Sequence, residues 1–457
     1  MNDAIIEQKS REMYEKIRAS RPQLNITGTA YYVSADGNDV SDGLSPETAW
    51  KTPEGVNTHF DGLQDGDAVL FRCGDVFRGR VNLKKGITYS SFGEGEKPHL
   101  YAATCNAVTL NWKEEKENIY SVEIPDETDI GCIVFNHGQA WGYKKLPSAP
   151  EVALDLDFYH DLDAGKLYLY SEKGNPAELW EDIELCPRVH NMSGNCPDGC
   201  TVDGLVIKYG GAHGISMGSL DYNTGGKPRH KNIYNVTIRN CEFEWIGGSI
   251  QHGEVRFGNG FEIWGGCDGL LIENCYFNQC YDAAVTQQYQ GTVSDDKVLS
   301  IENVTMRDNL IENSTYSYEY FLTEFKDETR AWREDSESTF RNILFENNIC
   351  RNTGYGWGNQ RPDRRTASHL KSWGHRNKAE NFVVKNNIFD RGDYRLIETK
   401  AYNDESLPTL IGNTYCQYLG KPIVCRQQTV SVMNEDTVKN NAIDNAEENA
   451  IICVARR

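Results

Sequence analysis

The chain has 457 residues, of which 39% are hydrophobic and 25% are charged, a composition typical of a soluble globular protein with a large core. Its net charge of −20 disfavours nucleic acid as a partner, because a face that binds a polyanion needs an excess of Lys and Arg. No run of about 18 apolar residues predicts a membrane span. We therefore expect a neutral or weakly charged partner, no nucleic acid and no membrane, with the oligomeric state left open.

The first 28 residues predict an amphipathic helix, because Ile6, Met13 and Ile17 lie roughly in line at helical spacing. The same segment has no apolar core of the length that a signal peptide requires, which predicts a cytoplasmic protein. Fourteen cysteines in a reducing compartment are expected to remain thiols. We expect the helix to cover an open end of the fold that follows, where strand edges would otherwise be exposed.

Residues 29–104 contain short apolar segments separated by turn residues. Residues 105–190 differ from the rest of the chain because they carry their own alternating strands, at 158–161 and 166–170. We interpret 105–190 as a small β insertion.

One pattern, apolar-x-apolar-x-Asn-x-x-apolar, recurs through the region 191–430. Six copies begin at Val236, Leu270, Val304, Ile343, Phe382 and Thr409, the third with Asp at the Asn position, and a weaker copy begins at Cys200. The turn positions 204, 240, 274, 308, 347, 386 and 413 lie 27 to 39 residues apart. A period of this size predicts a solenoid, and the local alternation predicts that its coils are made of strands. Asn or Gly suits a sharp corner with left-handed backbone geometry.

These repeats, with the opening segments 31–39, 42–46, 49–52 and 63–71, resemble the pectate-lyase-like superfamily of right-handed parallel β-helix proteins, many of which act on carbohydrates. The resemblance implies an all-β fold with three strands in each coil. The boundaries that we expect are an N-terminal capping helix (1–28), first coils (29–104), an inserted β subdomain (105–190), the main β-helix with the active-site groove (191–430) and a C-terminal cap (431–457).

The strand that follows each corner is expected to join one parallel sheet whose outer face carries the site. Alternation along these strands places Glu262, Lys371 and Glu398 outward, with Glu324 near them and Asp282 at the mouth of its strand. We take Glu324, Asp282, Glu398 and Lys371 as the candidate catalytic residues.

A sugar needs aromatic platforms for its C–H faces and polar groups for its hydroxyls. The candidate substrate-binding residues are Glu262, Trp264, Gln287, Gln288, Tyr355, Trp357, Arg361, Asp363, His369, Trp373 and Arg395. For each Trp, a role in packing is an equal alternative.

Glycoside hydrolysis requires two carboxylates that flank the bond. Because neighbouring coils are about 4.8 Å apart, Asp282 and Glu324 on adjacent coils fit a retaining pair at about 5 Å. Glu324 and Glu398, two coils apart, approach the roughly 6.5–9.5 Å of an inverting pair. Glu324 is common to both schemes, and its partner stays open. The sequence thus predicts a glycoside hydrolase with an oligosaccharide or polysaccharide substrate and without a cofactor or metal.

Two other functions compete with hydrolysis. A polysaccharide lyase or uronate epimerase would use Lys371 or His369 as the base and Arg395 to neutralise the uronate, although an ion pair with Glu324 or Glu398 is the preferred role for Lys371. The third hypothesis is a non-catalytic solenoid that binds glycans.

Overall fold

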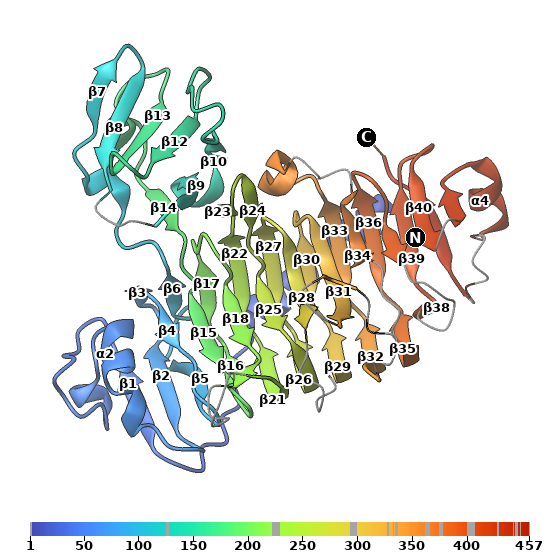
Figure 1. The fold of residues 1–457 in the computed structure, drawn as a ribbon, viewed down its shortest axis with the longest axis horizontal. Coiled ribbons are helices and arrows are strands. Elements are labelled where there is room, and N and C mark those ends of the chain that lie inside the picture. Colours follow the sequence, from blue (N-terminus) through green and yellow to red (C-terminus); the bar gives the residue numbers. More distant parts are fainter. Residues whose placement is uncertain are drawn as a thin grey trace.

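The computed structural model describes residues 2–456 except for 125–127, 222–228, 293–298, 327–328, 332, 334–336, 362–365, 374–377, 400–406, 427–428, 442, 444–446 and 448. The chain forms an elongated column of stacked strand coils, a right-handed parallel β-helix, with a lobe beside one end (Figure 1). This confirms the predicted fold class.

Each full coil gives one strand to each of three ten-stranded sheets, called sheets I, II and III in the order in which the chain visits them. Sheet I consists of β1 (Ala30–Val33), β2 (Ala68–Arg72), β5 (Thr88–Phe92), β16 (Thr201–Asp203), β21 (Asn232–Arg239), β26 (Gly266–Glu273), β29 (Ile301–Arg307), β32 (Thr339–Glu346), β35 (Lys378–Lys385) and β38 (Thr409–Ile411). Sheet II consists of β3 (Val76–Arg78), β6 (His99–Tyr101), β17 (Val206–Lys208), β22 (Glu242–Ile246), β27 (Tyr276–Cys280), β30 (Leu310–Glu312), β33 (Ile349–Thr353), β36 (Ile388–Gly392), β39 (Thr414–Gln417) and β42 (Ile451–Val454). Sheet III consists of β4 (Val81–Asn82), β15 (Met192–Asn195), β18 (Ile215–Gly218), β25 (Phe261–Trp264), β28 (Ala283–Thr292), β31 (Tyr316–Phe325), β34 (Ser368–Ser372), β37 (Ile397–Thr399), β40 (Pro422–Arg426) and β41 (Thr429–Val432), of which β40 and β41 pair antiparallel.

The corners between sheets I and II have the predicted left-handed backbone geometry, with φ between 53° and 58° at Asn240, Asn274, Asp308, Asn347 and Asn386. The last copy differs from the prediction, because its left-handed residue is Gly412, with φ of 63°, and not Asn413. Gly takes this conformation without the steric cost that a Cβ brings. Asn413 is therefore the residue after the corner, and its side chain lies inside the column.

A buried ladder of asparagines follows the corners on the last coils. The Nδ2 of Asn309 donates to Asn348 Oδ1 at 2.9 Å, Asn348 donates to Asn387 at 3.0 Å, and Asn387 donates to Asn413 at 2.9 Å. Asn413 Nδ2 then donates to Glu447 Oε1 at 2.9 Å. Each amide both donates and accepts, so the ladder satisfies buried polar groups and fixes the register of successive coils.

Replacing Asn348 by Ala is expected to lower the free energy of unfolding by about 2–3 kcal/mol, because the backbone N–H and the Nδ2 of buried Asn309 both lose their acceptor. Urea unfolding followed by circular dichroism measures the change. Asn342→Gly is the control, since Asn342 belongs to an exposed ladder and has a φ of 53° that Gly tolerates. We expect the control to cost less than about 1 kcal/mol, and equal losses for the two variants would contradict the explanation.

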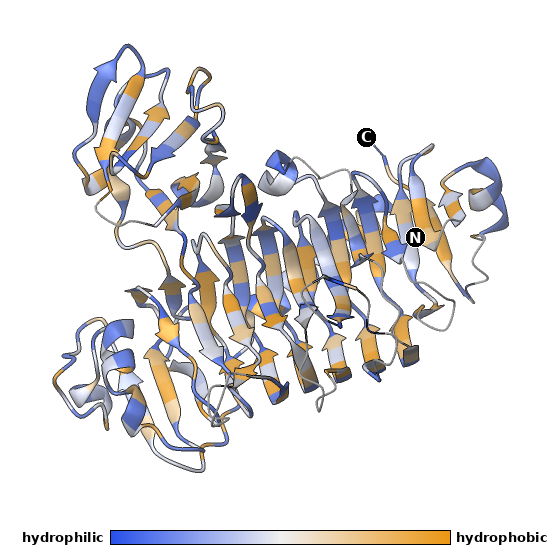
Figure 2. Ribbon diagram, in the orientation of Figure 1, coloured by the Kyte–Doolittle hydropathy of each residue, from blue (hydrophilic) through white to orange (hydrophobic). Residues whose placement is uncertain are grey.

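The apolar core runs along the inside of the column. Along the strands, apolar residues that point inward alternate with polar residues that point outward, as the changing colours in Figure 2 show. Aromatic rings stack from coil to coil, for example Phe243 on Phe277 with ring centroids 4.5 Å apart.

The N-terminal helix predicted from the sequence is α1 (Asp3–Ala19). It lies lengthwise on the outer face of sheet II and not over an open end, which corrects the predicted position. Its apolar stripe, Ile6 and Ile17, is fully buried in a cluster with Leu310, Ile349 and Ile388, side chains that point outward from this sheet. These side chains form one apolar row on the outer face of sheet II, and burying that row against the helix stabilises both surfaces.

The lobe in Figure 1 comes from the region predicted as an insertion, and it has its own hydrophobic core. Its strands are β7 (Lys113–Lys116), β8 (Ile119–Glu123), β9 (Ile130–Phe135), β10 (Ala140–Trp141), β11 (Tyr143–Lys144), β12 (Asp157–Asp161), β13 (Lys166–Tyr170) and β14 (Ile183–Pro187), arranged in sheets of five and three strands, with a short helix α3 (Pro176–Leu179). A bidentate ion pair between Arg78 and Glu184, at 2.7 and 2.9 Å, joins the lobe to the column.

Short elements complete the fold. Helix α2 (Pro53–Thr58) buries Val56 in the core beside the first coils, and α4 (Glu435–Asn440) precedes β42 at the other end. Two hairpins leave the column near sheet III, β19 (Leu220–Asp221) with β20 (Arg229–His230) and β23 (Ser249–His252) with β24 (Val255–Phe257). None of the helices in the described ranges combines the length and apolar character needed to cross a membrane.

Candidate active site

A row of polar side chains crosses the outer face of sheet III. Strand pairing places its members side by side on consecutive strands from β18 to β37, and they are Ser216, Glu262, Thr286, Glu319, Lys371 and Glu398. Their strand neighbours, such as Phe261, Val285, Tyr318 and Leu370, point into the core. The row therefore points outward, and it brings together three carboxylates that lie far apart in the sequence.

Glu319 is the carboxylate of this row with the most perturbed acidity. Thr286 Oγ1 donates to its Oε2 at 3.1 Å, and the indole N–H of Trp373 donates to its Oε1. Burial, followed by the nearby negative charge of Asp282, raises the pKa of Glu319 to about 7, against the opposing effect of the Trp373 hydrogen bond. A carboxyl group of this kind is substantially protonated near neutral pH and can act as a general acid.

Glu319 was not among the residues predicted from the sequence. The strand was expected to begin at Phe321, whereas β31 begins at Tyr316. The alternation of Tyr318, Tyr320 and Leu322 was the signal available in the sequence, because it places Glu319 on the opposite face from these core residues.

Asp282 lies just before β28 and pairs with Arg361, whose Nη1 is 2.5 Å from Asp282 Oδ1. The Arg361 guanidinium also lies 5.7 Å from the ring centroids of Tyr281 and Tyr316. The Asp282 side chain is 17% exposed, compared with 8% for Glu262. The charge of Asp282 raises the pKa of Glu319, and the Asp282 side chain is more exposed to a ligand than that of Glu262.

Glu262 accepts three hydrogen bonds, from His213 Nε2 at 3.1 Å, Asn259 Nδ2 at 3.0 Å and Gln288 Nε2 at 2.7 Å. Burial alone would raise the pKa of Glu262, but the His213 ring and the hydrogen bonds outweigh burial and lower it. The pKa values of Glu262 and Glu319 are thus moved in opposite directions on one face, a pattern that separates an acid from an ionised carboxylate.

Lys371 and Glu398 form an ion pair at 3.2 Å at the far end of the row, and both side chains are buried. Arg395 Nε lies 3.6 Å from the other oxygen of Glu398, and Lys371 Nζ lies 4.1 Å from the ring centroid of Trp373. The ion pair with Glu398 agrees with the role preferred for Lys371 from the sequence.

Replacing Lys371 by Met is expected to lower the free energy of unfolding by about 3–5 kcal/mol, because Glu398 remains buried without its ammonium partner. The double variant Lys371→Met/Glu398→Gln should lose less, since it leaves no uncompensated charge. Lys385→Met is the control, because the Lys385–Glu346 pair at 3.1 Å is partly exposed and should contribute at most about 1 kcal/mol. Urea unfolding checks all three, and a double variant no more stable than Lys371→Met would contradict the ion-pair explanation.

Glu324 does not lie on the outer face, which corrects the central residue of the sequence prediction. It is five positions from Glu319 on β31 and therefore points to the opposite side, with Tyr320 and Leu322. It is buried and accepts a hydrogen bond from Ser338 Oγ. The structure therefore separates Glu324 from Glu398, and neither predicted pair that includes Glu324 can form.

Three of the predicted substrate-binding residues are instead part of the interior. Gln287 Oε1 accepts a hydrogen bond from Tyr318 at 2.8 Å, and His369 lies between Ser317 Oγ at 2.9 Å and the carbonyl of Asp390 at 3.2 Å. Burial lowers the pKa of His369 to about 3. Trp357 is fully buried and donates to a backbone carbonyl at 2.7 Å. Their strand or loop positions turn these side chains inward, where each completes the packing.

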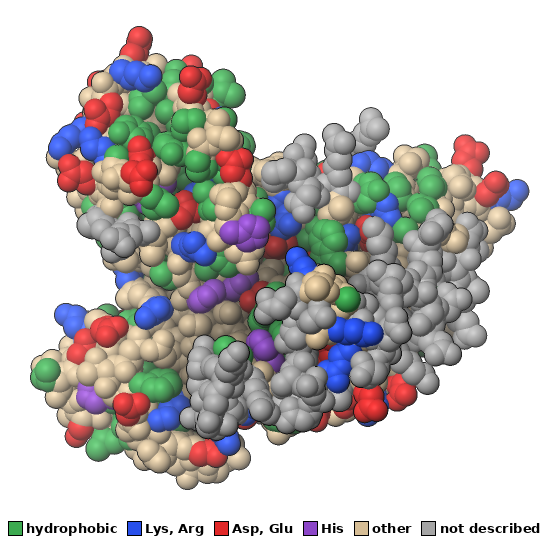
Figure 3. All heavy atoms as spheres, viewed as in Figure 1, with side chains coloured by type: hydrophobic (Ala, Val, Ile, Leu, Met, Phe, Trp, Pro, Cys, Tyr) green, Lys and Arg blue, Asp and Glu red, His purple; other side chains and the backbone are tan. Residues whose placement is uncertain are grey.

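Three predicted aromatic residues remain accessible, because Trp264, Tyr355 and Trp373 are 37%, 40% and 42% exposed. Trp264 follows Glu262 by two positions and so shares its outward face. Asp363 lies outside the described residues. In Figure 3, histidine side chains gather in the hollow between the lobe and the column.

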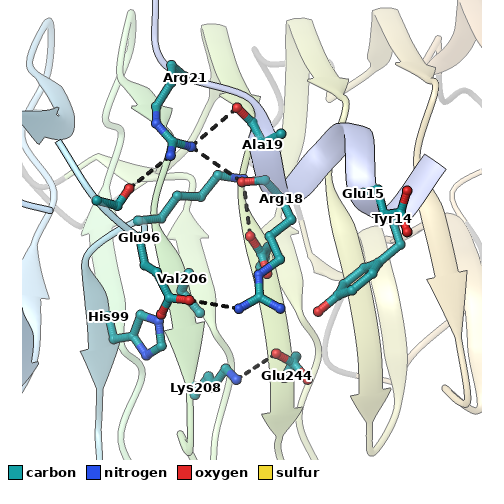
Figure 4. A pocket seen from close by; sticks show the side chains of 13 residues that line it. Tyr14, Glu15, Arg18, Ala19, Arg21, Glu96, His99, Val206, Lys208 and Glu244 are labelled. Atoms are coloured by element: carbon teal, nitrogen blue, oxygen red, sulfur yellow. Dashed lines mark hydrogen bonds and ion pairs between the residues drawn. The ribbon is translucent and has the colours of Figure 1, made fainter. Parts of the chain in front are cut away.

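A hollow of about 640 Å³ lies on a different side of the column, between α1 and sheet II (Figure 4). The charged groups that line it neutralise one another, with Arg18 2.9 Å from Glu96 and Lys208 2.6 Å from Glu244. The Arg18–Glu96 pair fastens the end of α1 beside the column, and the Lys208–Glu244 pair joins neighbouring strands of sheet II. The outer face of sheet III remains the better candidate for chemistry.

No protein-family model matches the chain, and no curated protein matches it. Among solved structures it is similar to a GH136 lacto-N-biosidase from Eubacterium ramulus, with 12% identity and a TM-score of 0.45 over 94% of this chain and 68% of that one. It is also similar to XylC in complex with xylose (12% identity, TM-score 0.44, 93% and 83% covered) and to an alginate lyase from Paenibacillus sp. str. FPU-7 (11%, 0.36, 89% and 97%). Because the identities are 12% or lower and the TM-scores are below 0.5, these similarities say nothing about the function of this chain.

Proposed function

We propose that the protein is a glycoside hydrolase that cleaves a neutral oligosaccharide or polysaccharide, with Glu319 as the general acid and Asp282 as the second carboxylate. The observation that carries the proposal is the place of Glu319 on the outward row, between Thr286 and Trp373, where burial first and the charge of Asp282 second raise its pKa to about 7. Two nearby carboxylates, one protonated and one ionised, are what glycosidic cleavage requires.

Asp282 lies on the coil next to Glu319, four positions before Thr286, the residue that is paired with Glu319. We assign this pair a retaining mechanism as part of the proposal. Glu319 gives its proton to the glycosidic oxygen while an Asp282 oxygen attacks the anomeric carbon, so the bond to the leaving group breaks as the ester to Asp282 forms. Glu319, now a carboxylate, removes a proton from water. The water oxygen then displaces Asp282, which restores both groups and gives a product with the original anomeric configuration.

The same face disfavours elimination from a uronate. A lyase needs a base and a cation free to neutralise the uronate, whereas Lys371 and Arg395 are matched with Glu398 and Arg361 is matched with Asp282. Lys371 is fully buried, and His369 points into the core.

Turnover of a panel of aryl glycosides, neutral oligosaccharides and uronate polymers, with products identified by mass and by proton NMR, tests the proposal. We expect hydrolysis products with retained anomeric configuration. Inversion would assign the second carboxylate to Glu262, which lies two strands from Glu319, about 9.6 Å at the usual spacing. Unsaturated products would show a lyase, and binding without turnover would show a glycan-binding solenoid.

A further inference from the structure

His190, His213 and Asn259 form a ladder beside sheet III. Each lies two positions before the residues Met192, Ile215 and Phe261, which are paired across β15, β18 and β25, so the three occupy one equivalent site on successive coils. The backbone N–H of His213 donates to His190 Nδ1 at 3.1 Å, and that of Asn259 donates to His213 Nδ1 at 2.9 Å. The two imidazole rings are stacked, with centroids 5.1 Å and planes 3° apart.

These contacts fix where the ring protons are. Because Nδ1 of both histidines accepts from a backbone N–H, the proton of each neutral ring is on Nε2. Burial lowers the pKa of His190 to about 3, so its ring is neutral at ordinary pH. His213 uses its Nε2–H to hold Glu262, which lies one coil further along.

His190 Nε2 points toward the next coil as His213 Nε2 does, but the residue opposite it is different. The position that corresponds to Glu262 on that coil is Ser216, whose side chain is too short to reach the ring in the same way. Within the described part of the chain, no residue accepts a hydrogen bond from His190 Nε2. The ring is partly exposed, so a donor of fixed direction is presented above Ser216 and next to the ionised Glu262.

We propose that His190 is a substrate-binding residue that donates a hydrogen bond from Nε2 to a hydroxyl of a neutral sugar unit, in a subsite over Ser193 and Ser216. This inference rests on the proposed glycosidase function. It implies that a bound sugar chain extends from the Asp282–Glu319 pair, past Glu262, toward β15. A hydroxyl suits a neutral donor, whereas the charge of Glu262 repels a carboxylate or phosphate at this place.

The variant His190→Asn tests the proposal. Asn is already the third member of the ladder, where Asn259 Oδ1 accepts the N–H of Ala283 at 2.9 Å, so the substitution keeps the acceptor for His213 and removes Nε2. For the neutral oligosaccharide that is turned over best, we expect KM to rise about tenfold with little change in kcat. The aryl monoglycoside of the same sugar, which is too short to reach the subsite, should be unaffected. His137→Asn, on an exposed residue of the lobe, is the control.

Equal losses on the long and the short substrate would overturn the proposal, because they would show that His190 acts through His213 and Glu262. Unchanged kinetics on both would overturn it as well. If the wild-type protein hydrolyses no glycoside, the proposed function fails by itself. Calorimetric titration with gluco-, xylo-, galacto- and N-acetylgluco-oligosaccharides then tests His190 separately. About tenfold weaker binding to His190→Asn supports the subsite, whereas equal affinity or no binding to either protein rejects it.

Discussion

Replacing Glu319 by Gln is expected to lower kcat/KM for oligosaccharides by about 10³-fold, because the leaving oxygen then departs without a proton. Glutamine is nearly isosteric and keeps an acceptor for Thr286 or Trp373, so the fold should be retained. Aryl glycosides with strongly acidic leaving phenols need no proton and should lose much less. Comparing kcat/KM for the two substrate classes separates a missing acid from a damaged site.

Glu324→Gln is the matched control on the same strand. Because Glu324 points to the interior side of β31, this variant should keep the ratio of activities on the two substrate classes, whatever it costs in stability. Loss of the oligosaccharide reaction in Glu324→Gln, with retention in Glu319→Gln, would return the acid to the residue first predicted.

The acidity of Glu319 also predicts how activity depends on pH. The folded pKa, about 7, is raised above the ordinary value of 4.5, so the protonated and active form predominates below about pH 7 and is lost as the pH rises. The basic limb of kcat/KM should therefore fall near pH 7 and be absent in Glu319→Gln with an activated substrate. The same shift favours the folded state at low pH, so that this contribution to stability declines between about pH 4.5 and 7.

Replacing Asp282 by Asn is expected to lower kcat/KM by about 10⁴-fold or more for every substrate, including activated aryl glycosides, because attack on the anomeric carbon requires the carboxylate. This uniform loss differs from the substrate-dependent loss expected for Glu319→Gln. Removing the charge of Asp282 should also lower the pKa of Glu319, since that charge helps to raise it.

Azide provides the decisive measurement for Asp282. In Asp282→Gly, azide can occupy the vacated space and attack the anomeric carbon of an activated glycoside, giving a glycosyl azide of inverted configuration that NMR identifies. Glu262→Gln is the comparison. If Glu262→Gln is inactive while Asp282→Asn still turns over with inversion, the second carboxylate is Glu262 and the mechanism is inverting.

The repeat and its corners were readable from the sequence because they depend on local chemistry. Alternating apolar residues and an Asn at each left-handed turn recur coil after coil, and each copy specifies the same backbone path. The place of Asp282 immediately before a strand was readable for a related reason, because short-range signals fix where β28 begins. The ion pair between Lys371 and Glu398 could be predicted because the repeat places their two strands on neighbouring coils.

The position of the proposed acid depended on the tertiary structure. Side chains alternate with a period of two, so an error of an odd number of positions exchanges the inner and outer residues of a strand. The strand was expected to begin at Phe321, five positions after the true start of β31 at Tyr316, and Glu324 was placed near the outer face while Glu319 was left out of the strand. The same dependence moved Gln287 and His369 from the outer face into the core.

The sequence by itself determined the coiled architecture and the presence of acids along one side of it, because hydrophobic period and turn chemistry act over a few residues. Only the tertiary structure decided which carboxylate has a raised pKa, since burial and the charge of Asp282 raise the pKa of Glu319 against the opposing effects of Trp373 and Arg361. These groups reach Glu319 from different coils and loops. Burial and charge separation at this site are properties of the folded surface, and no local pattern encodes them.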